Sequence, residues 1–340
     1  MNYIGSKYSI LDFLYTAITD VTGHLEGKVF ADLFAGTGVV GAKFRENGSF
    51  VIANDFQHYS YAINRHLIGN PADLPRDKID YLNSLSGVEG FVYNNYCQGS
   101  GSGRIYFTDE NGKKCDAVRQ ELQRMYDAGE ISDDQYWFCL ASVLNSIDKY
   151  ANTASVYGAH LKHIKKAAEK RFVIEPLAAP DGPLGRVYNQ DVSDLIEEVR
   201  GEVLYLDPPY NARQYNANYH LLETISRYDS PALMGKTGLR KETARKSGFC
   251  SKRNVAGDFE TIIRRANFKY IFLSYNNEGL MSFETIRNIM QKYGRYDVVS
   301  KDHRRFRADK EANRKHKAKK TTEYLHCLVK YTNQDGQYAF

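Results

Sequence analysis

A short apolar segment followed by a glycine-rich turn and a helix most limits how this chain can fold. Residues 28–34 form an apolar run that predicts a strand, and a helical pattern follows near 38–46. The turn between them reads Asp32-Leu-Phe-Ala-Gly36-Thr-Gly38-Val-Val-Gly41. Glycines in such a turn let the backbone approach a ligand closely at a helix N-terminus. The pattern predicts a strand–turn–helix unit that binds an adenosine-containing cofactor.

The same alternation of strands and helices recurs at both ends of the chain. Further strands are expected at 50–53, 202–206, 270–275, 295–299 and 323–330, and helices near 9–21, 58–68, 191–198, 217–227, 257–267 and 282–292. Strands separated by helices of this length predict βαβ units and a mostly parallel sheet. The expected fold class is therefore α/β.

The middle of the chain breaks this alternation. A Gly/Ser run covers 98–103, and prolines stand near both ends of the region. We predict a hairpin over 104–115 with its turn at Asn111-Gly112, and then helices near 116–127, 132–148 and 158–171. These elements predict a mainly helical domain at 71–184, inserted into a domain made of 1–70 and 185–340.

A second motif, Asp207-Pro208-Pro209-Tyr210, directly follows the apolar strand 202–206. It therefore lies at the carboxyl end of a parallel strand, where open α/β sheets bind ligands. The Asp207 carboxylate and the Pro208 carbonyl can accept both N–H bonds of an exocyclic amine and stabilise the positive charge that develops during methylation. Tyr210 offers an aromatic face for stacking a base, and we expect this face to matter more than the hydroxyl.

The glycine motif also fits a nicotinamide or flavin site, since GxGxxG after a strand is the dinucleotide fingerprint and Asp55 ends the next strand. Asp55 can bind ribose hydroxyls in either case. Asp32 favours S-adenosylmethionine, because a carboxylate is unfavourable beside a pyrophosphate and favourable beside the cofactor's α-amino group.

Basic charge is concentrated in two segments of a chain whose net charge is only +5. Residues 236–253 carry seven Lys/Arg against one acidic residue, and residues 301–320 carry ten against three. A third basic stretch lies within 145–171 and is expected to hold a recognition helix. These segments predict contacts with a phosphate backbone, from the residues Lys162, Lys165, Lys166, Lys236, Arg240, Arg245, Arg304 and Arg305. Arg213, shortly after Tyr210, is also expected to contact DNA.

The segment Asn2-Tyr-Ile-Gly5-Ser-Lys7, the glycine motif and Asp207–Tyr210 together resemble the D12 class of DNA adenine N6-methyltransferases, in the alpha arrangement. The resemblance implies a Rossmann-like S-adenosylmethionine-dependent methyltransferase fold, with the inserted region as the target-recognition domain. It implies cofactor contacts from Tyr3, Gly5, Lys7, Asp32, Phe34, Ala35, Gly36, Gly38, Asp55 and Asp191. Asp191 has an equal alternative role as the N-cap of the helix near 192–198.

The resemblance implies methylation of adenine N6 at a specific site in double-stranded DNA by base flipping, within a restriction–modification system. The catalytic residues would be Asp207, Pro208, Pro209 and Tyr210, and no metal is expected. The same chemistry on cytosine N4 or on an RNA base is the alternative. A catalytically idle nucleic-acid-binding protein and a NAD-dependent enzyme also remain open at this point.

Five scattered cysteines and the lack of a long apolar run exclude a disulfide framework and a membrane helix. With no recognisable secretory signal, we expect a cytoplasmic protein of bacterial or phage type, associated with the nucleoid through DNA. We also expect a monomer, with any cognate restriction endonuclease acting separately.

Overall fold

The computed structural model describes residues 3–154, 156–212, 215–241, 247–304 and 320–331, except the side chains of 303, 304, 320 and 321. The chain divides into two compact units, which are described separately. Unit 1 comprises Met1–Ile4, Gln57–Ala179 and Tyr215–Ala244. Unit 2 comprises Gly5–Phe56, Pro180–Gln214 and Arg245–Phe340.

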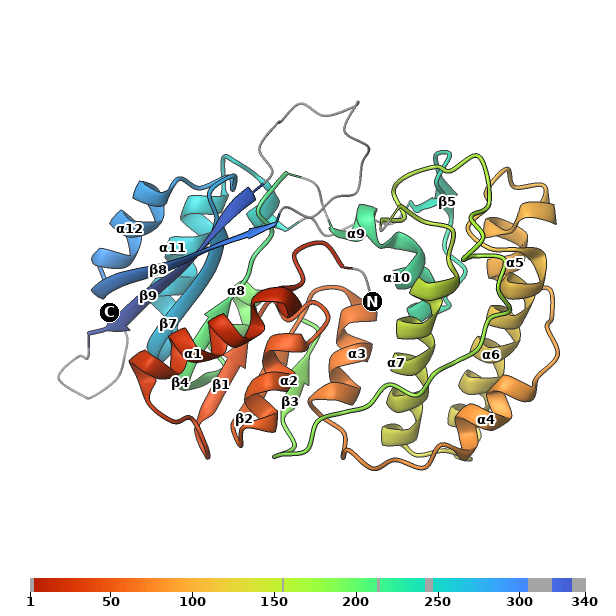
Figure 1. Cartoon of the computed structure of the whole chain (residues 1–340), viewed down its shortest axis with the longest axis horizontal. Helices are drawn as coiled ribbons and strands as arrows, with labels where there is room; N and C mark the ends of the chain where they lie inside the picture. Colours follow the sequence, from red (N-terminus) through yellow and green to blue (C-terminus); the bar gives the residue numbers. More distant parts are fainter. Residues whose placement is uncertain (1–2, 155, 213–214, 242–246, 305–319, 332–340) are drawn as a thin grey trace. The chain divides into compact units, whose positions relative to one another are not determined.

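Unit 2 contains a seven-stranded sheet in the order β3-β2-β1-β4-β7-β9-β8 (Figure 1). Its strands are β1 (Val29–Asp32), β2 (Phe50–Asn54), β3 (Arg186–Tyr188), β4 (Arg200–Leu206), β7 (Asn267–Asn276), β8 (Gly294–Arg304) and β9 (Lys320–Lys330). The first five in the sheet order are parallel to one another, and β9 and β8 pair antiparallel at one edge. The expected α/β fold with a mostly parallel, Rossmann-like sheet is confirmed.

Helices cover both faces of this sheet because successive strand residues point to opposite sides. Phe30 of β1 stacks on Phe44 of α2 at 3.8 Å between ring centroids. Ala31, the next residue, belongs to a core cluster with side chains of α8, α11 and α12. The helical segments of unit 2 are η1 (Lys7–Ile10), α1 (Leu11–Thr22), α2 (Val39–Glu46), α8 (Val192–Leu195), η3 (Gly248–Cys250), α11 (Val255–Arg265) and α12 (Phe283–Gln291).

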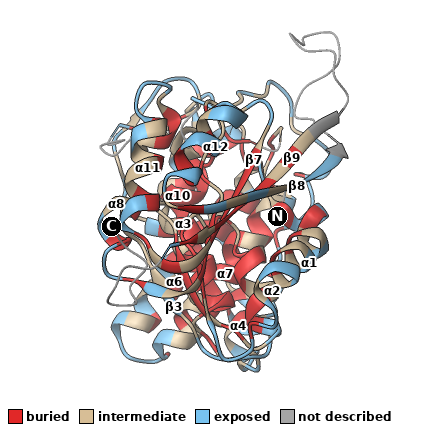
Figure 2. Cartoon of the chain, turned by 90° about the vertical axis from the view of Figure 1, so that its left-hand side faces the viewer, coloured by how far each residue is buried: buried red, intermediate tan, exposed pale blue. Residues whose placement is uncertain are grey.

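Unit 1 is mainly helical, with a short β5–β6 hairpin (Leu233–Met234 and Leu239–Arg240). Its helical segments are α3 (His58–Leu67), α4 (Asp77–Ser84), α5 (Phe91–Tyr96), η2 (Gln98–Ser100), α6 (Asp109–Asp127), α7 (Asp133–Tyr150), α9 (Tyr215–Asn218) and α10 (His220–Arg227). Helix α7 is largely buried, since α3, α4, α6 and α10 all pack against it (Figure 2). A capping box formed by Ser132 and Gln135 starts α7.

The predicted hairpin over 104–115 is wrong, because Asn111 and Gly112 lie inside α6. Thr108 caps α6, and Asp109 and Glu110 occupy its first turn, where negative charge is favourable. Gly112 serves packing rather than a turn, since a Cβ there would lie 1.9 Å from the sulfur of Cys97.

The predicted recognition helix near 158–171 is also absent, as these residues form turns and irregular structure. The buried Asn152 side chain organises part of this segment. Its amide donates to the carbonyls of Ile105 and His163, at 2.9 and 3.0 Å, and its oxygen accepts from the Lys165 N–H at 3.1 Å. These bonds replace the backbone pairing that a helix would supply.

The compact units have different limits from the expected inserted domain at 71–184. The longest segment of unit 1 starts at Gln57, and the unit also includes Tyr215–Ala244, which the sequence pattern places with the catalytic domain. The physical reason is packing, because α3 and α10 contact each other and α7. The role of unit 1 in target recognition remains a proposal.

Candidate active site

The candidate site lies in unit 2, at the carboxyl ends of the adjacent parallel strands β1 and β4. Asp32 ends β1 and pairs in register with Tyr205, two residues before Asp207. The strand order changes direction here, since β2 and β3 lie on one side of β1 whereas β4 and β7 lie on the other. Such a switch point is where open α/β sheets leave a crevice for a ligand.

The turn after β1 adopts a backbone conformation that requires glycine. Gly36 and Gly38 have φ values of 52° and 77°, in the left-handed region that residues with a Cβ rarely adopt. Gly38 is the N-cap of α2, and the Gly36 N–H donates to Asp55 Oδ2 at 2.8 Å. Asp55, at the end of β2, therefore holds the glycine turn in place.

Asp32 is a buried carboxylate with an unsatisfied oxygen. Its residue is 1% exposed, and Oδ1 has no hydrogen-bond partner among the described residues. Burial, with the nearby charges of Asp207 and Asp55, raises the pKa of Asp32 well above its ordinary value. A cation placed against this carboxylate would offset the cost of ionising it.

Asp207 is bound by two donors that come from different parts of the chain. Lys7 Nζ lies 3.0 Å from Asp207 Oδ1, and the Tyr210 hydroxyl donates to the same oxygen at 2.7 Å. Lys7 also donates to the Tyr210 hydroxyl. Burial raises the pKa of Asp207 to about 6, although the positive charge of Lys7 opposes this rise.

Glu323 completes the cluster, and sequence reasoning missed it. Its Oε1 accepts from Lys7 Nζ at 2.8 Å, from the Tyr210 hydroxyl at 2.5 Å and from Ser274 Oγ at 2.7 Å. Burial alone would lower the pKa of Lys7, but attraction to Asp207 and Glu323 raises it. The available signal was a carboxylate at the start of the apolar segment 323–330, where an ionised side chain needs a partner.

Aromatic side chains line the same part of unit 2. Phe34, in the glycine turn, packs edge-on against Phe249 at 5.0 Å between ring centroids. Tyr210 packs edge-on against Tyr275 at 4.9 Å, and its carbonyl accepts from the Leu280 N–H at 3.0 Å. The sequence pointed to Phe34 and Tyr210 but not to Phe249 or Tyr275.

These residues fit an S-adenosyl cofactor. The unsatisfied carboxylate of Asp32 suits an ammonium group, and the open glycine turn suits close backbone contact. Phe34 and Phe249 offer aromatic surface for a purine. The site thus has a buried carboxylate and a glycine turn after β1 and a second carboxylate after β4.

Comparison with known protein families identifies the family to which the chain belongs. The model of the D12 class of N6 adenine-specific DNA methyltransferases matches residues 3–289. The chain belongs to that family. S-adenosylmethionine is accordingly its methyl donor. The family therefore excludes the two alternatives of a NAD-dependent enzyme and a catalytically idle nucleic-acid-binding protein. The family description also favours adenine in DNA over cytosine N4 or an RNA base.

Named relatives are similar to this methyltransferase over nearly its whole length. The Type II methyltransferase M.NlaIII of Neisseria lactamica is 52% identical, over 97% of this chain and 99% of the relative. M.CviAII of Paramecium bursaria Chlorella virus 1 is 35% identical, over 91% of this chain and 93% of the relative. M.FokI of Planomicrobium okeanokoites is also 35% identical, but the match covers only 53% of that longer protein.

Three residues expected at the cofactor have other contacts in the methyltransferase. Tyr3 belongs to unit 1, where its hydroxyl lies 3.0 Å from that of Tyr59 and its ring stacks on Tyr219 at 4.5 Å. Asp191 Oδ1 accepts from the Ser193 N–H at 2.9 Å, so it does cap α8 as the alternative predicted. Lys7 contacts Asp207 and Glu323, as described above. Gly5 has a φ of 80°, and Ala35 is buried in the glycine turn.

The residues expected to bind DNA differ in their exposure. Arg240 is buried in unit 1 and makes a bidentate ion pair with Asp229 at 2.6 and 2.7 Å, which corrects its assignment as a phosphate contact. Lys162, Lys166 and Lys236 are exposed, as is Lys165, whose ammonium donates to the Thr153 carbonyl. Arg213, Arg245 and Arg305, together with the side chain of Arg304, lie outside the described residues.

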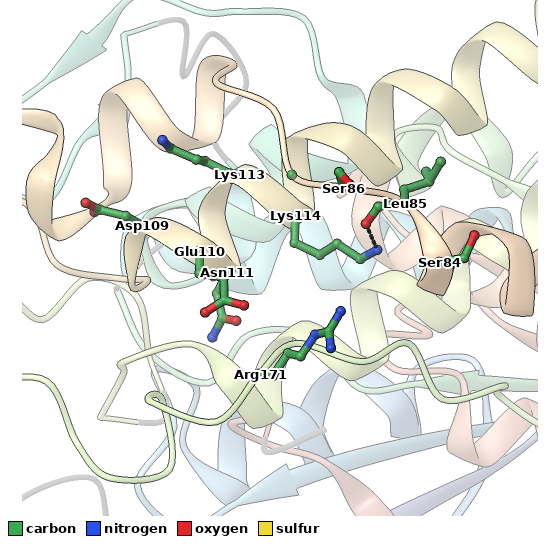
Figure 3. A pocket seen from close by; sticks show the side chains of 10 residues that line it. Ser84, Leu85, Ser86, Asp109, Glu110, Asn111, Lys113, Lys114 and Arg171 are labelled. Carbon is green, nitrogen blue, oxygen red and sulfur yellow. Dashed lines mark hydrogen bonds between the residues drawn. The ribbon is translucent and has the colours of Figure 1, made fainter.

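Unit 1 of the methyltransferase contains a pocket of about 490 Å³ beside α4 and α6 (Figure 3). Its basic lining residues are Lys113, Lys114 and Arg171. Lys114 donates to the carbonyls of Leu82 and Asn83, at 2.9 and 2.8 Å, and so caps the end of α4. This cavity contains none of the motif residues, and Lys114 has a structural role there.

Within the part of the chain that the structure describes, no helix is long and apolar enough to cross a bilayer. The described residues likewise contain no group of three or more His, Cys, Asp or Glu side chains placed to hold a metal ion.

Proposed function

We propose that this chain transfers a methyl group to N6 of one adenine within a specific sequence of double-stranded DNA, after flipping that base out of the helix. The observation that carries the proposal is the position of Asp207. It follows β4 at the switch point of the sheet, beside the buried carboxylate of Asp32, and Lys7 and Tyr210 both bind its Oδ1.

Asp32 and the glycine turn would hold the cofactor. The Asp32 carboxylate would bind the α-ammonium, the backbone at Gly36 and Gly38 would lie against the methionine and ribose portions, and Asp55 would accept from ribose hydroxyls. Asp55 keeps one oxygen on the Gly36 N–H, so its position is tied to that of the turn. S-adenosylmethionine supplies an electrophilic methyl group when it is bound.

Asp207 and Pro208 would act on the target amine. The lone pair of an adenine amino group is delocalised into the ring, which makes the nitrogen a weak nucleophile. Acceptors on both N–H bonds favour a tetrahedral nitrogen and stabilise its developing positive charge. Methyl transfer from a sulfonium requires no Lewis acid, so we propose a metal-free reaction.

The base must leave the duplex to reach this site. In B-form DNA, the adenine amine is paired and stacked in the major groove, and extrusion costs a few kcal/mol. Stacking on an aromatic side chain returns roughly 1–3 kcal/mol. Tyr210 is the candidate for this contact within the motif. We propose that unit 1 reads the sequence and that exposed lysines such as Lys162, Lys166 and Lys236 contact phosphates.

The relatives point to a biological setting. M.NlaIII, M.FokI and M.CviAII are named Type II methyltransferases. By analogy, we propose that this chain is the modification enzyme of a restriction–modification system. It would act as a monomer on DNA in the cytoplasm of a bacterium, with the endonuclease as a separate protein.

Expression in a methylation-free host tests the proposal. Single-molecule sequencing of the host DNA should reveal one recurring motif with N6-methyladenine at a fixed position. The Asp207→Ala variant, expressed at the same level, should leave that motif unmodified. Modified cytosine, or unmodified DNA with the wild-type protein, would contradict the proposal.

A further inference from the structure

Glu323 is a buried carboxylate in the active site whose role neither the sequence motifs nor the family description states. It stands on β9, where it pairs with Asn276 of β7 and Lys301 of β8, and its side chain is 2% exposed. Three donors converge on its Oε1, from Lys7, Tyr210 and Ser274. Such convergence favours the ionised carboxylate despite its burial.

Glu323 and Asp207 share two of these donors. Lys7 Nζ is 2.8 Å from Glu323 Oε1 and 3.0 Å from Asp207 Oδ1. The Tyr210 hydroxyl is 2.5 Å from the first oxygen and 2.7 Å from the second. A tyrosine hydroxyl has one proton, so it donates fully to only one carboxylate at a time. Glu323 therefore competes with Asp207 for both the ammonium and the hydroxyl.

This competition affects how strongly Asp207 can bind an amine. A carboxylate whose charge is fully balanced by its own lysine is a weaker acceptor for an external N–H. With two carboxylates and one ammonium, the cluster carries a net negative charge when both carboxyls are ionised. In a site shielded from water, that charge stabilises the positive charge that develops on the target nitrogen.

We propose that Glu323 is a positioning residue for methyl transfer. It holds the Lys7 ammonium and the Tyr210 hydroxyl in place and accepts hydrogen bonds that would otherwise go to Asp207. Asp207 therefore remains a strong acceptor for the target amine. This inference rests on the proposed role of Asp207 as that acceptor.

The charged and polar groups around Asp207 set its pKa, so a change in Glu323 should be visible in the pH dependence of the rate. Burial raises the pKa of Asp207, and the negative charge of Glu323 raises it further, whereas Lys7 and the Tyr210 hydroxyl lower it. Asp32 and Tyr205 also interact electrostatically with Asp207. Removing the charge of Glu323 leaves Lys7 to pair with Asp207 alone. The acidic limb of the pH–rate profile should then move down by about one pH unit, because a like charge has been removed.

The experiment compares single-turnover methylation of unmethylated DNA by the wild type, Glu323→Gln and Glu323→Asp between pH 5 and pH 8. Tritiated S-adenosylmethionine reports transfer, and excess enzyme keeps product release from limiting the rate. Binding of S-adenosylhomocysteine, measured by thermal shift, checks that each variant is folded. The control is Glu284→Gln, which removes an exposed carboxylate of α12 elsewhere in unit 2.

Glu323→Gln should lose roughly 10- to 100-fold in rate at pH 8, by analogy with the removal of a hydrogen-bond partner from a metal-binding side chain. Its acidic limb should lie below that of the wild type. Glu323→Asp should show a smaller change in the same direction and retain more activity, and Glu284→Gln should match the wild type. If Glu323→Gln does not fold, the position of the acidic limb in Glu323→Asp tests the inference instead.

An acidic limb that stays in place in every folded Glu323 variant overturns the inference, whatever the rate at pH 8. This failure is distinct from failure of the proposed function. In the latter case, the wild-type enzyme itself would transfer no methyl group to adenine.

Discussion

The Lys7 ammonium lies 3.0 Å from Asp207 Oδ1, although the two residues belong to motifs in different parts of the sequence. The family resemblance implies that Lys7 contacts the cofactor. In the structure its ammonium binds the carboxylates of Asp207 and Glu323, and each of these ion pairs is largely buried. Lys7 can therefore influence methyl transfer through the charge and orientation of Asp207.

Asp207→Asn should abolish methyl transfer and leave cofactor binding almost unchanged. Asparagine has nearly the same shape but carries no charge to stabilise the developing positive charge, and loss of such a group typically costs at least ~100-fold in rate. Single-turnover methylation and calorimetric binding of S-adenosylhomocysteine measure the two properties separately. Near-wild-type transfer by this variant would remove Asp207 from its assigned role.

The methylation rate should fall on the acidic side near pH 6. The pKa of Asp207 is raised to about 6, so its carboxylate is mostly protonated below that pH and can no longer stabilise positive charge. The rate should rise between pH 5 and pH 7 and then level off. Lys7→Met removes a charge that lowers this pKa, so its acidic limb should lie at higher pH. A flat wild-type profile from pH 5 to pH 8 is inconsistent with this explanation.

Asp32→Asn should weaken cofactor binding. The variant retains the size of the side chain but removes the charge that we assign to the α-ammonium, and a hydrogen bond to a charged group contributes about 1.5–3 kcal/mol. The dissociation constant for S-adenosylhomocysteine should therefore rise roughly tenfold or more. Asp12→Asn, at an exposed position of α1, is the matched control and should bind as the wild type does. Equal affinities for Asp32→Asn and the control would contradict the assignment.

Emission from 2-aminopurine at the target position should rise when the enzyme and S-adenosylhomocysteine bind, because a flipped base loses its stacking neighbours. A mispaired target should bind more tightly than a paired one, since its extrusion costs less. No rise in emission, together with indifference to mispairing, would mean that the base is reached in another way.

Tyr210 variants should separate the ring from the hydroxyl. Tyr210→Ala removes the stacking face, worth roughly 1–3 kcal/mol, as well as the hydrogen bonds to Asp207 and Glu323. Tyr210→Phe removes only the hydrogen bonds, so its single-turnover rate should fall between those of the wild type and Tyr210→Ala. The expectation that the face matters more than the hydroxyl stays a prediction, and the two hydrogen bonds add a contribution of the hydroxyl. Equal rates for Tyr210→Phe and the wild type would show that these hydrogen bonds do not contribute.

The features of this protein that depend on local pattern can be predicted from the amino-acid sequence. The alternation of apolar strands and helices predicted the parallel sheet, and the glycines at 36 and 38 predicted a tight turn between a strand and a helix, in which both residues have positive φ. Asp207 was predicted at the carboxyl end of a strand because its motif directly follows one. Each of these features is set by residues that are close together in the chain.

The prediction from sequence was wrong where one segment fitted two local patterns. Asn111-Gly112 has the form of a hairpin turn, but Thr108, Asp109 and Glu110 also form a helix start, and the helix was selected. The close packing of Gly112 against Cys97 helped decide the outcome, and that contact exists only in the folded unit. The segment 158–171 similarly depends on hydrogen bonds to the buried Asn152 rather than on its own helical pattern.

The pairing of the charged groups in the active site depends on long-range packing and could not be predicted from the sequence. Lys7 and Glu323 are separated by 316 positions, and no sequence pattern specifies that their side chains meet at 2.8 Å beside Asp207. Arg240 likewise belongs to a basic stretch of the sequence, but it is buried in unit 1 and paired with Asp229. Charges are counted along a sequence, but their pKa values and roles depend on burial and on neighbours, which only the folded chain brings together.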